Sequence, residues 1–206
     1  MKKTLLTIII LFLGTFSVSA QLYRYLDTQQ GLSSRRVIAV EKDQKGYMWF
    51  LTQEGVDRYN GKQFTNYTLS DGNRPVLHFP NLSQLHIDNQ DDIWVTGKNG
   101  FIFKYNQMLD KYDLVMNFAD SLKTKRRLPL THTSIDRQNN LWLCTRNAQY
   151  IYRTDTKHVI KLETPIKEEV FYIEQAKGNR YFFGTRENVY VASLKGNRLV
   201  LEPEHT

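Results

Sequence analysis

The sequence contains a single cysteine, Cys144, among its 206 residues. One cysteine cannot form an internal disulfide, so the stability of the fold has to come from packing, and Cys144 itself is expected to be buried and unreactive. A membrane helix needs about 20 consecutive apolar residues, and no segment after residue 20 provides them. We therefore expect no membrane span in the rest of the chain.

Sequence signatures of catalysis and of cofactor binding are also missing. The five histidines share no metal-ligand spacing, and neither a nucleophile elbow nor a phosphate-binding loop occurs. The net charge of +7 is scattered along the chain and does not indicate nucleic-acid binding. The sequence thus predicts no catalytic residue, no metal, no cofactor and no nucleic-acid partner for this segment.

The first twenty residues have the pattern of an export signal. Lys2 and Lys3 precede an apolar stretch over residues 5–13, and Val18-Ser19-Ala20 forms a small-residue cleavage site before Gln21. This pattern predicts a signal peptide over residues 1–20 and a periplasmic, extracytoplasmic protein over residues 21–206. The alternative is a membrane anchor that is retained, although the apolar stretch is short for a span.

The rest of the chain repeats itself at a period of about 40–50 residues, which is typical of propeller blades. In three copies an aspartate stands six residues before a tryptophan, and in a weaker fourth copy a phenylalanine takes the tryptophan place. The aspartates are Asp43, Asp88 and Asp136, and the aromatic residues are Trp49, Trp94, Trp142 and Phe182.

Each copy divides into four short strand-like segments separated by turns that carry Gly, Asn or Asp. The predicted fold is all-β, with about four four-stranded propeller blades at residues 37–68, 84–118, 133–163 and 170–203. Residues 47–52 are apolar on both faces, which indicates a sheet packed between two neighbours. The four repeated aromatic residues are therefore predicted to be core, with sugar stacking as the alternative for the tryptophans.

The repeated aspartates are expected to accept backbone N–H bonds in the turns that follow them. The functional alternative is calcium binding, above all at the acidic stretch over residues 88–92. That stretch lacks the alternating ligands, the central glycine and the distal glutamate of an EF-hand loop.

Residues 22–26 resemble an outer strand that has no inner strands before it. A ring that closes through such a strand needs a last blade with three strands of its own, but the fourth copy supplies four. We therefore expect an incomplete ring with an open edge. A closed four-bladed propeller is the alternative.

The first copy resembles the two-component regulator propeller repeats of periplasmic sensors. The resemblance rests on Gly31-Leu32-Ser33-Ser34 and on the segment from Asp43 to Tyr59, while Gly97 and Ala148 depart from the repeat in later copies. It implies the extracytoplasmic input module of a Bacteroides-type hybrid sensor histidine kinase that responds to oligosaccharides. The histidine kinase motifs themselves are not in this sequence, so the segment is expected to be non-catalytic.

The longest joints between predicted blades, residues 69–83 and 119–132, would project from one face, where propellers often bind ligands. Their candidate ligand-binding residues are Asn73, Arg74, His78, Arg126, Arg127 and His132. The basic run over residues 123–127 would favour acidic sugars, unless it is only a solvated loop. Two other functions stay open: a polysaccharide or antibiotic lyase or hydrolase that uses His78 and His132, and an interaction scaffold that forms homodimers through the exposed face of the fourth copy.

Overall fold

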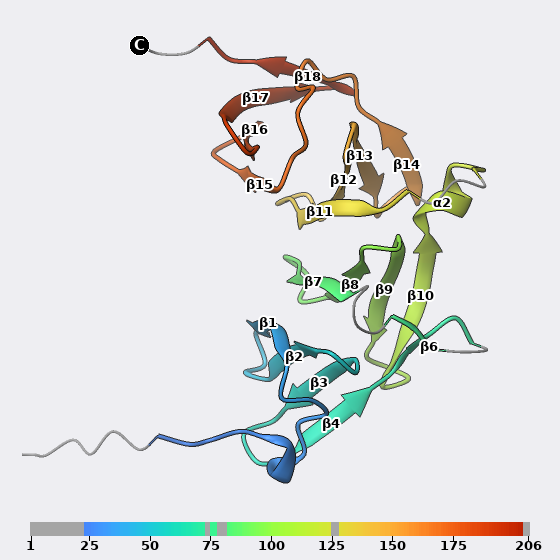
Figure 1. Ribbon diagram of the computed structural model, residues 1–206, viewed down its shortest axis with the longest axis vertical. Coiled ribbons are helices and arrows are strands. Elements are labelled where there is room, and N and C mark those ends of the chain that lie inside the picture. The colour runs from blue at the N-terminus through green and yellow to red at the C-terminus, as the bar shows by residue number, and fades with distance from the viewer. Residues whose placement is uncertain (1–22, 73–74, 78–81, 125–127, 204–206) are drawn as a thin grey trace, which may run out of the picture.

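The computed structural model describes residues 23–72, 75–77, 82–124 and 128–203 (Figure 1). They form four four-stranded antiparallel sheets and one two-stranded hairpin. Within each four-stranded sheet the strands neighbour one another in chain order. Each strand is therefore joined to the next by a hairpin turn at the strand ends. The prediction of four consecutive four-stranded blades is confirmed.

Blade 1 consists of β1 (Val37–Lys42), β2 (Met48–Thr52), β3 (Val56–Tyr59) and β4 (Phe64–Tyr67). Blade 2 consists of β7 (Leu82–Ile87), β8 (Ile93–Gly97), β9 (Phe101–Asn106) and β10 (Lys111–Asn117). Blade 3 consists of β11 (Leu130–Ile135), β12 (Leu141–Thr145), β13 (Ala148–Arg153) and β14 (His158–Lys161). Blade 4 consists of β15 (Tyr172–Gln175), β16 (Arg180–Gly184), β17 (Val189–Lys195) and β18 (Arg198–Leu201).

Short elements lie outside the blades. A 3-10 turn, η1 (Thr28–Gln30), precedes blade 1, and a hairpin of β5 (Leu69–Ser70) and β6 (Pro75–Leu77) follows it. A single helical turn, α2 (Phe118–Ser121), joins blade 2 to blade 3. Neither the hairpin nor the helical turn was expected from the sequence.

The blades are arranged as an open arc (Figure 1). The first strands β1, β7, β11 and β15 lie along its inner side, while β10 and β14 lie on its outer side. Blades 1 and 4 are at opposite ends, and the four blade sheets are separate rather than one closed sheet. The expected incomplete ring is confirmed.

The hydrophobic core lies between blades rather than within them. Trp49 and Leu51 of blade 1 pack with Val95 and Phe103 of blade 2, and equivalent clusters join blade 2 to blade 3 and blade 3 to blade 4. All five residues of β8 and all five of β12 are buried. A middle strand with neighbours on both faces therefore loses the polar alternation of an ordinary antiparallel strand.

The six-residue spacing between Asp and Trp has a direct physical explanation. One carboxylate oxygen of Asp43 accepts the backbone N–H of Tyr47 at 2.8 Å, and the other accepts the indole N–H of Trp49 at 2.9 Å. The pairs Asp88–Trp94 and Asp136–Trp142 repeat the indole bond at 2.9 and 3.1 Å. The aspartate closes the turn and satisfies the only polar atom of a buried indole ring.

The fourth copy keeps the predicted register, but Phe182 is not buried. The N–H of Ala176 bonds the carbonyl oxygen of Arg180 as that of Asp136 bonds Asn140, so Phe182, six residues after Ala176, takes the Trp place. Successive side chains of a strand face opposite ways, so Tyr181 packs against blade 3 and is 1% exposed, whereas Phe182 faces away from blade 3 and is 39% exposed. The assignment of Phe182 to the core is therefore wrong, because no described blade covers its face, while Trp49, Trp94 and Trp142 are buried.

The outer strand expected at residues 22–26 is not formed, because residues 23–27 have no regular secondary structure and Tyr23 and Tyr25 are exposed. A lone strand has no partner for its backbone groups in this open arc. The segment instead folds onto blade 1. Arg24 donates to the carbonyl oxygen of Gly61 at 2.9 Å, and its guanidinium lies over the ring of Tyr59.

The Gly-Leu-Ser-Ser motif fastens this segment to the free face of blade 1. Leu32 is buried, and Ser33 donates both its backbone N–H and its hydroxyl to Asp57, each at 2.7 Å. Asn66 donates to Asp57 and to the carbonyl oxygen of Gly31. The motif thus supplies the donors that the fully buried Asp57 carboxylate requires.

Candidate functional site

Five of the six predicted ligand-binding residues lie outside the part of the chain that the structure describes, so their arrangement is not defined. They are Asn73, Arg74, His78, Arg126 and Arg127. His132 is described, but it belongs to β11 and not to the preceding loop, and it is only 9% exposed. The loop placement of His132 was wrong because β11 begins at Leu130, two residues earlier than the joint was expected to end.

His132 links three blades through its ring. Its Nδ1 lies 3.2 Å from the amide nitrogen of Gln84 on β7, and its Nε2 accepts the backbone N–H of Ile173 on β15 at 3.2 Å. Burial lowers the pKa of His132 to about 4. Both ring nitrogens face nitrogen donors, so a protonated ring has no acceptor here, and a proton-transfer role at neutral pH is not supported.

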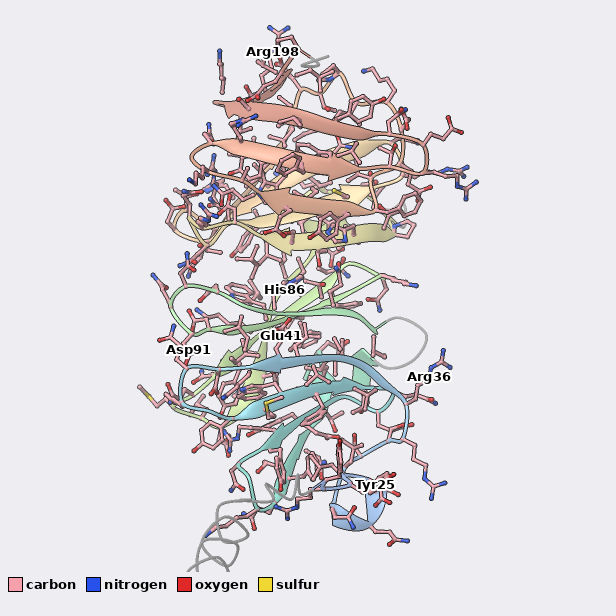
Figure 2. The ribbon with its side chains drawn as sticks, turned by 90° about the vertical axis from the view of Figure 1, so that its left-hand side faces the viewer. Tyr25, Arg36, Glu41, His86, Asp91 and Arg198 are labelled. Carbon is pink, nitrogen blue, oxygen red and sulfur yellow. The ribbon has the colours of Figure 1, made fainter. Side chains whose placement is uncertain are left out.

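The inner strands of neighbouring blades are joined by side chains. The Gln84 carbonyl oxygen accepts the backbone N–H of Thr133 at 2.5 Å and its hydroxyl at 2.8 Å. His86 on β7 meets the same hydroxyl at 2.9 Å, and burial together with the nearby His132 lowers the pKa of His86 to about 4. This network lies on the inner side of the arc, where Figure 2 shows His86 and Glu41 on adjacent inner strands.

A further part of the predicted loop face lies at the junction of blades 3 and 4. A hollow of about 340 Å³ opens there between the joint that leads into β15 and the β12–β13 and β16–β17 turns. We call it the loop-face hollow. It is lined by Arg146, Asn147, Lys167, Glu168, Glu169, Phe171, Arg186 and Glu187.

Glu168 fixes the joint onto blade 4. Its carboxylate accepts hydrogen bonds from the Thr185 hydroxyl at 2.5 Å, from the Asn188 amide at 3.0 Å and from the Tyr190 hydroxyl. These bonds, that of Thr185 first, lower the pKa of Glu168. Ser33 bonds Thr52 in the same way at the start of blade 1, so both blades hold the incoming segment at the turn after their second strand.

The loop-face hollow offers the chemistry of a polar binding site. Phe171 is 44% exposed and presents an aromatic face, while arginine, asparagine and glutamate side chains surround it. Its three basic and three acidic residues balance in formal charge. Sequence reasoning missed this region because it ranked joints by length, and the joint between β14 and β15 is shorter than the other two.

The Asp88 turn does not present free ligands for calcium. Its carboxylate already accepts the N–H groups of Gln90, Asp92 and Trp94. Across the described residues there is no group of three or more His, Cys, Asp or Glu side chains arranged to hold a metal. In the same part of the chain no helix is both long and apolar enough to cross a membrane.

Comparison with solved structures places this blade arrangement among known folds. The extracellular domain of BT3049 from B. thetaiotaomicron, named as a hybrid two-component system, superposes with a TM-score of 0.67 over 87% of this chain at 19% identity. The extracellular domain of BT4673 from the same organism gives 0.68 over 86% at 14% identity. The chain has the fold of propeller blades.

The same propeller fold occurs in proteins of other kinds. A streptogramin B lyase structure gives a TM-score of 0.61 over 85% of this chain at 14% identity, and the match covers 57% of that lyase chain. The chain spans about a quarter of the two B. thetaiotaomicron domains, 26% and 25%. No protein-family model and no curated protein matches the sequence.

Proposed function

We propose that this chain is an extracytoplasmic ligand-sensing module of a two-component signalling receptor. The observation that carries the proposal is the likeness of its blades to the extracellular domains of two proteins named as hybrid two-component systems. The Gly-Leu-Ser-Ser and Asp-to-Tyr repeat of blade 1 and the export signal over residues 1–20 point the same way. In this proposal the chain is periplasmic and binds without catalysing a reaction.

The ligand that we propose is an oligosaccharide bound in the loop-face hollow. An exposed aromatic ring beside amide, guanidinium and carboxylate groups suits sugar rings, which have an apolar face and hydroxyl groups at their edge. The balanced charge of the hollow favours neutral over acidic sugars. This differs from the acidic preference that the basic run over residues 123–127 suggested, three residues of which lie outside the described part of the chain.

A thermal-shift and calorimetry panel of neutral and acidic oligosaccharides tests the proposal on the exported chain. We expect at least one neutral sugar to raise the melting temperature, and the variants Phe171→Ala and Arg186→Ala to lose that shift. Met108→Ala is the matched control, because Met108 is 92% exposed and does not line the hollow. Absence of any sugar-dependent shift in the folded protein would contradict the oligosaccharide assignment.

Export is tested separately. We expect the protein recovered from a periplasmic fraction to begin at Gln21, as measured by intact-mass spectrometry. A protein that keeps residues 1–20 and sediments with membranes would instead support a retained anchor.

A lyase or hydrolase is the second candidate, favoured by the likeness to a streptogramin B lyase structure. Fold alone does not carry that activity across. The buried His132, whose Nε2 accepts the backbone N–H of Ile173, is poorly suited to serve as its acid or base. Turnover of a streptogramin or polysaccharide that is lost in His132→Gln would nevertheless establish this function.

A further inference from the structure

A groove of about 800 Å³ lies between blades 2 and 3. We call it the 2–3 groove. Trp94 and Lys104 of blade 2 and Tyr152 and Lys157 of blade 3 line it, together with an apolar strip on β10 that includes Leu114 and Met116. It opens beside the β7–β8 turn, which holds Asp91 and lies on the opposite side of the arc from Arg36 and the segment entering β1 (Figure 2). It is therefore separate from the loop-face hollow.

Between blades 1 and 2 the part of this space beside Trp49 is almost filled and measures about 60 Å³, while a separate hollow of about 500 Å³ lies between the outer strands β4 and β10. The guanidinium of Arg58 lies within 6 Å of the ring centres of Trp49 and Tyr105, and it donates to the Tyr105 hydroxyl at 2.6 Å. The carboxylate of Asp110 accepts from Tyr105 at 2.5 Å, from Tyr67 at 2.7 Å and from Arg58 at 3.2 Å. A cation and its internal counter-ion thus fill the part of the first junction beside Trp49.

Strand pairing makes the two junctions directly comparable. Arg58 is paired with Trp49 across β2 and β3, as Lys104 is paired with Trp94 across β8 and β9. In the following blades, Tyr105 and Tyr152 hold the same position, each one residue before the end of its strand. Five residues after each tyrosine, Asp110 and Lys157 both adopt the left-handed conformation, with φ of 48° and 59°.

The 2–3 groove therefore has the same arrangement of a base, a tryptophan and a tyrosine, but the carboxylate of the first junction is replaced. Lys157 stands where the first junction has Asp110. Tyr152 is 5% exposed and lines the groove, but within the described part of the chain its hydroxyl has no hydrogen-bond partner. Burial raises the pKa of Tyr152, so that hydroxyl is a neutral donor. The donor that Asp110 satisfies in the first junction has no internal acceptor in the second.

Three carboxylates and two lysines line the groove, and they differ in whether they have partners: Asp88, Asp92, Asp155, Lys104 and Lys157. Lys104 lies over the Trp94 ring and pairs with Asp92 at 2.5 Å, so one base already has a counter-ion. Asp155 accepts the neighbouring backbone N–H of Thr156. Lys157 has no ion-pair partner among the described residues, and the exposed His158 uses its Nδ1 on the carbonyl oxygen of Thr156.

We propose that the 2–3 groove binds the carboxylate group of a small ligand, which takes the place that the Asp110 side chain holds in the first junction. The hydroxyl of Tyr152 and the ammonium of Lys157 bind the carboxylate. Leu114, Met116 and Val159 contact the less polar part of the ligand. The site is independent of the sugar-binding proposal, because it uses another face of the molecule and other residues.

Two carboxylate probes distinguish an organic acid from an acidic sugar: hexanoate and trigalacturonate. Their neutral partners, hexanamide and the methyl-esterified trimer, serve as ligand controls in titration calorimetry. We expect at least one carboxylate probe to bind at least tenfold more tightly than its neutral partner, with an affinity that falls as salt rises. The probe that binds identifies the source of the carboxylate.

The decisive variant is Lys157→Asp, which recreates the counter-ion of the first junction inside the protein. Aspartate tolerates the left-handed conformation, so the variant keeps its fold, and an unchanged melting profile checks this. We expect carboxylate binding to fall at least tenfold in Lys157→Asp and Tyr152→Phe, and to persist in Lys62→Asp, which makes the same charge change in the β3–β4 turn of blade 1. Equal binding of acid and neutral probes, no binding of either acid, or unchanged binding in Lys157→Asp would each overturn the proposal.

Discussion

The two ends of the arc differ in how their outer faces are covered. At blade 1, the segment around η1 lies on the sheet, and Ser33 supplies two hydrogen bonds to the buried Asp57. At blade 4, the outward side chains of Tyr172, Phe182 and Val200 are 53%, 39% and 37% exposed. Blade 4 therefore alternates buried and exposed positions, whereas blades 2 and 3 bury both faces of their middle strands.

Blade 4 shows that a blade face can carry apolar side chains even where no other segment covers it. The repeat places aromatic and β-branched residues on both faces of each blade, which is the pattern of a blade packed between two neighbours. Whether a given face is covered depends on which other segment of the chain packs against it. Exposed apolar patches of this kind mark interaction surfaces or association hazards.

The largest expected effect on the free energy of unfolding is a difference between the two faces of β16. Phe183 is fully buried against blade 3, whereas its neighbour Phe182 faces out from the end of the arc. We expect Phe183→Ala to lower the free energy of unfolding by about 3–5 kcal/mol, because it leaves a cavity in the core. Phe182→Ala should cost about 1 kcal/mol or less, since it buries little. Urea unfolding of both variants measures the contrast, and equal losses would contradict the register described here.

The next effect concerns the links between blades in the middle of the arc. The folded state keeps His132 neutral, with a pKa of about 4 against an ordinary value of 6.5. Its contribution is present above pH 6.5 and is lost as the pH falls through the window from 6.5 to 4. A shift of this size corresponds to about 3 kcal/mol.

Stability measured by urea unfolding between pH 7 and pH 4 checks this expectation. His132→Gln should remove about half of the acid loss, because His86 keeps its own lowered pKa, while His158→Gln, which changes an exposed histidine, serves as the control. An identical pH profile in wild type and His132→Gln would show that His132 is not the group that couples the blades to pH.

A smaller effect distinguishes the covered end from the bare end. Ser33→Ala removes a hydroxyl that donates to the buried Asp57 carboxylate, and leaving such a group short of a donor costs about 1–3 kcal/mol. Ser193→Ala on blade 4 removes a bond to Glu202 that water can replace, so it should cost less than about 0.5 kcal/mol. Thermal unfolding of the pair gives the comparison, and a similar loss in both would argue against a capping role for the Gly-Leu-Ser-Ser motif.

The smallest effect on folding is expected from changes that make the bare end polar. Phe182→Ser with Val200→Ser should leave the free energy of unfolding within about 1 kcal/mol of wild type. If the face mediates homodimers, as its apolar side chains suggest, the double variant should shift the molar mass measured by light scattering from dimer to monomer. A wild-type protein that is monomeric at all concentrations would remove this face as a dimer contact.

Much of the blade arrangement could be predicted because its signals are local. The Asp-to-Trp spacing reports a turn followed by a buried strand, and both partners of that hydrogen bond lie in one hairpin. In blade 4 the signal weakens, since Ala176 replaces the aspartate and three aromatic residues follow one another from Tyr181 to Phe183. Thr185 still gives the register, because it follows Phe182 by three residues and bonds the carbonyl oxygen of Asn188 as Thr145 bonds that of Ala148.

The candidate sites were less predictable for a physical reason. His132 was assigned to a loop, although its Thr-rich surroundings belong to a strand whose side chains bond Gln84 and Ile173 from other blades. The loop-face hollow depends on three short segments from two blades, and the 2–3 groove on residues 94, 104, 152 and 157. No local pattern indicates that such distant residues meet.

The sequence by itself determined the four blades, their hairpin turns and the tryptophans that fill the junctions, because each follows from hydrogen bonding and alternation within about 40 residues. Tertiary structure decided which blade faces are covered, where His132 lies and which junction stays open. Those outcomes depend on how side chains from successive blades fit together. Asp110 and Lys157 occupy matching turns, but Asp110 bonds Arg58 and Tyr67 of the adjacent blade and fills the space beside Trp49, whereas the space beside Trp94 and Lys157 is an open groove.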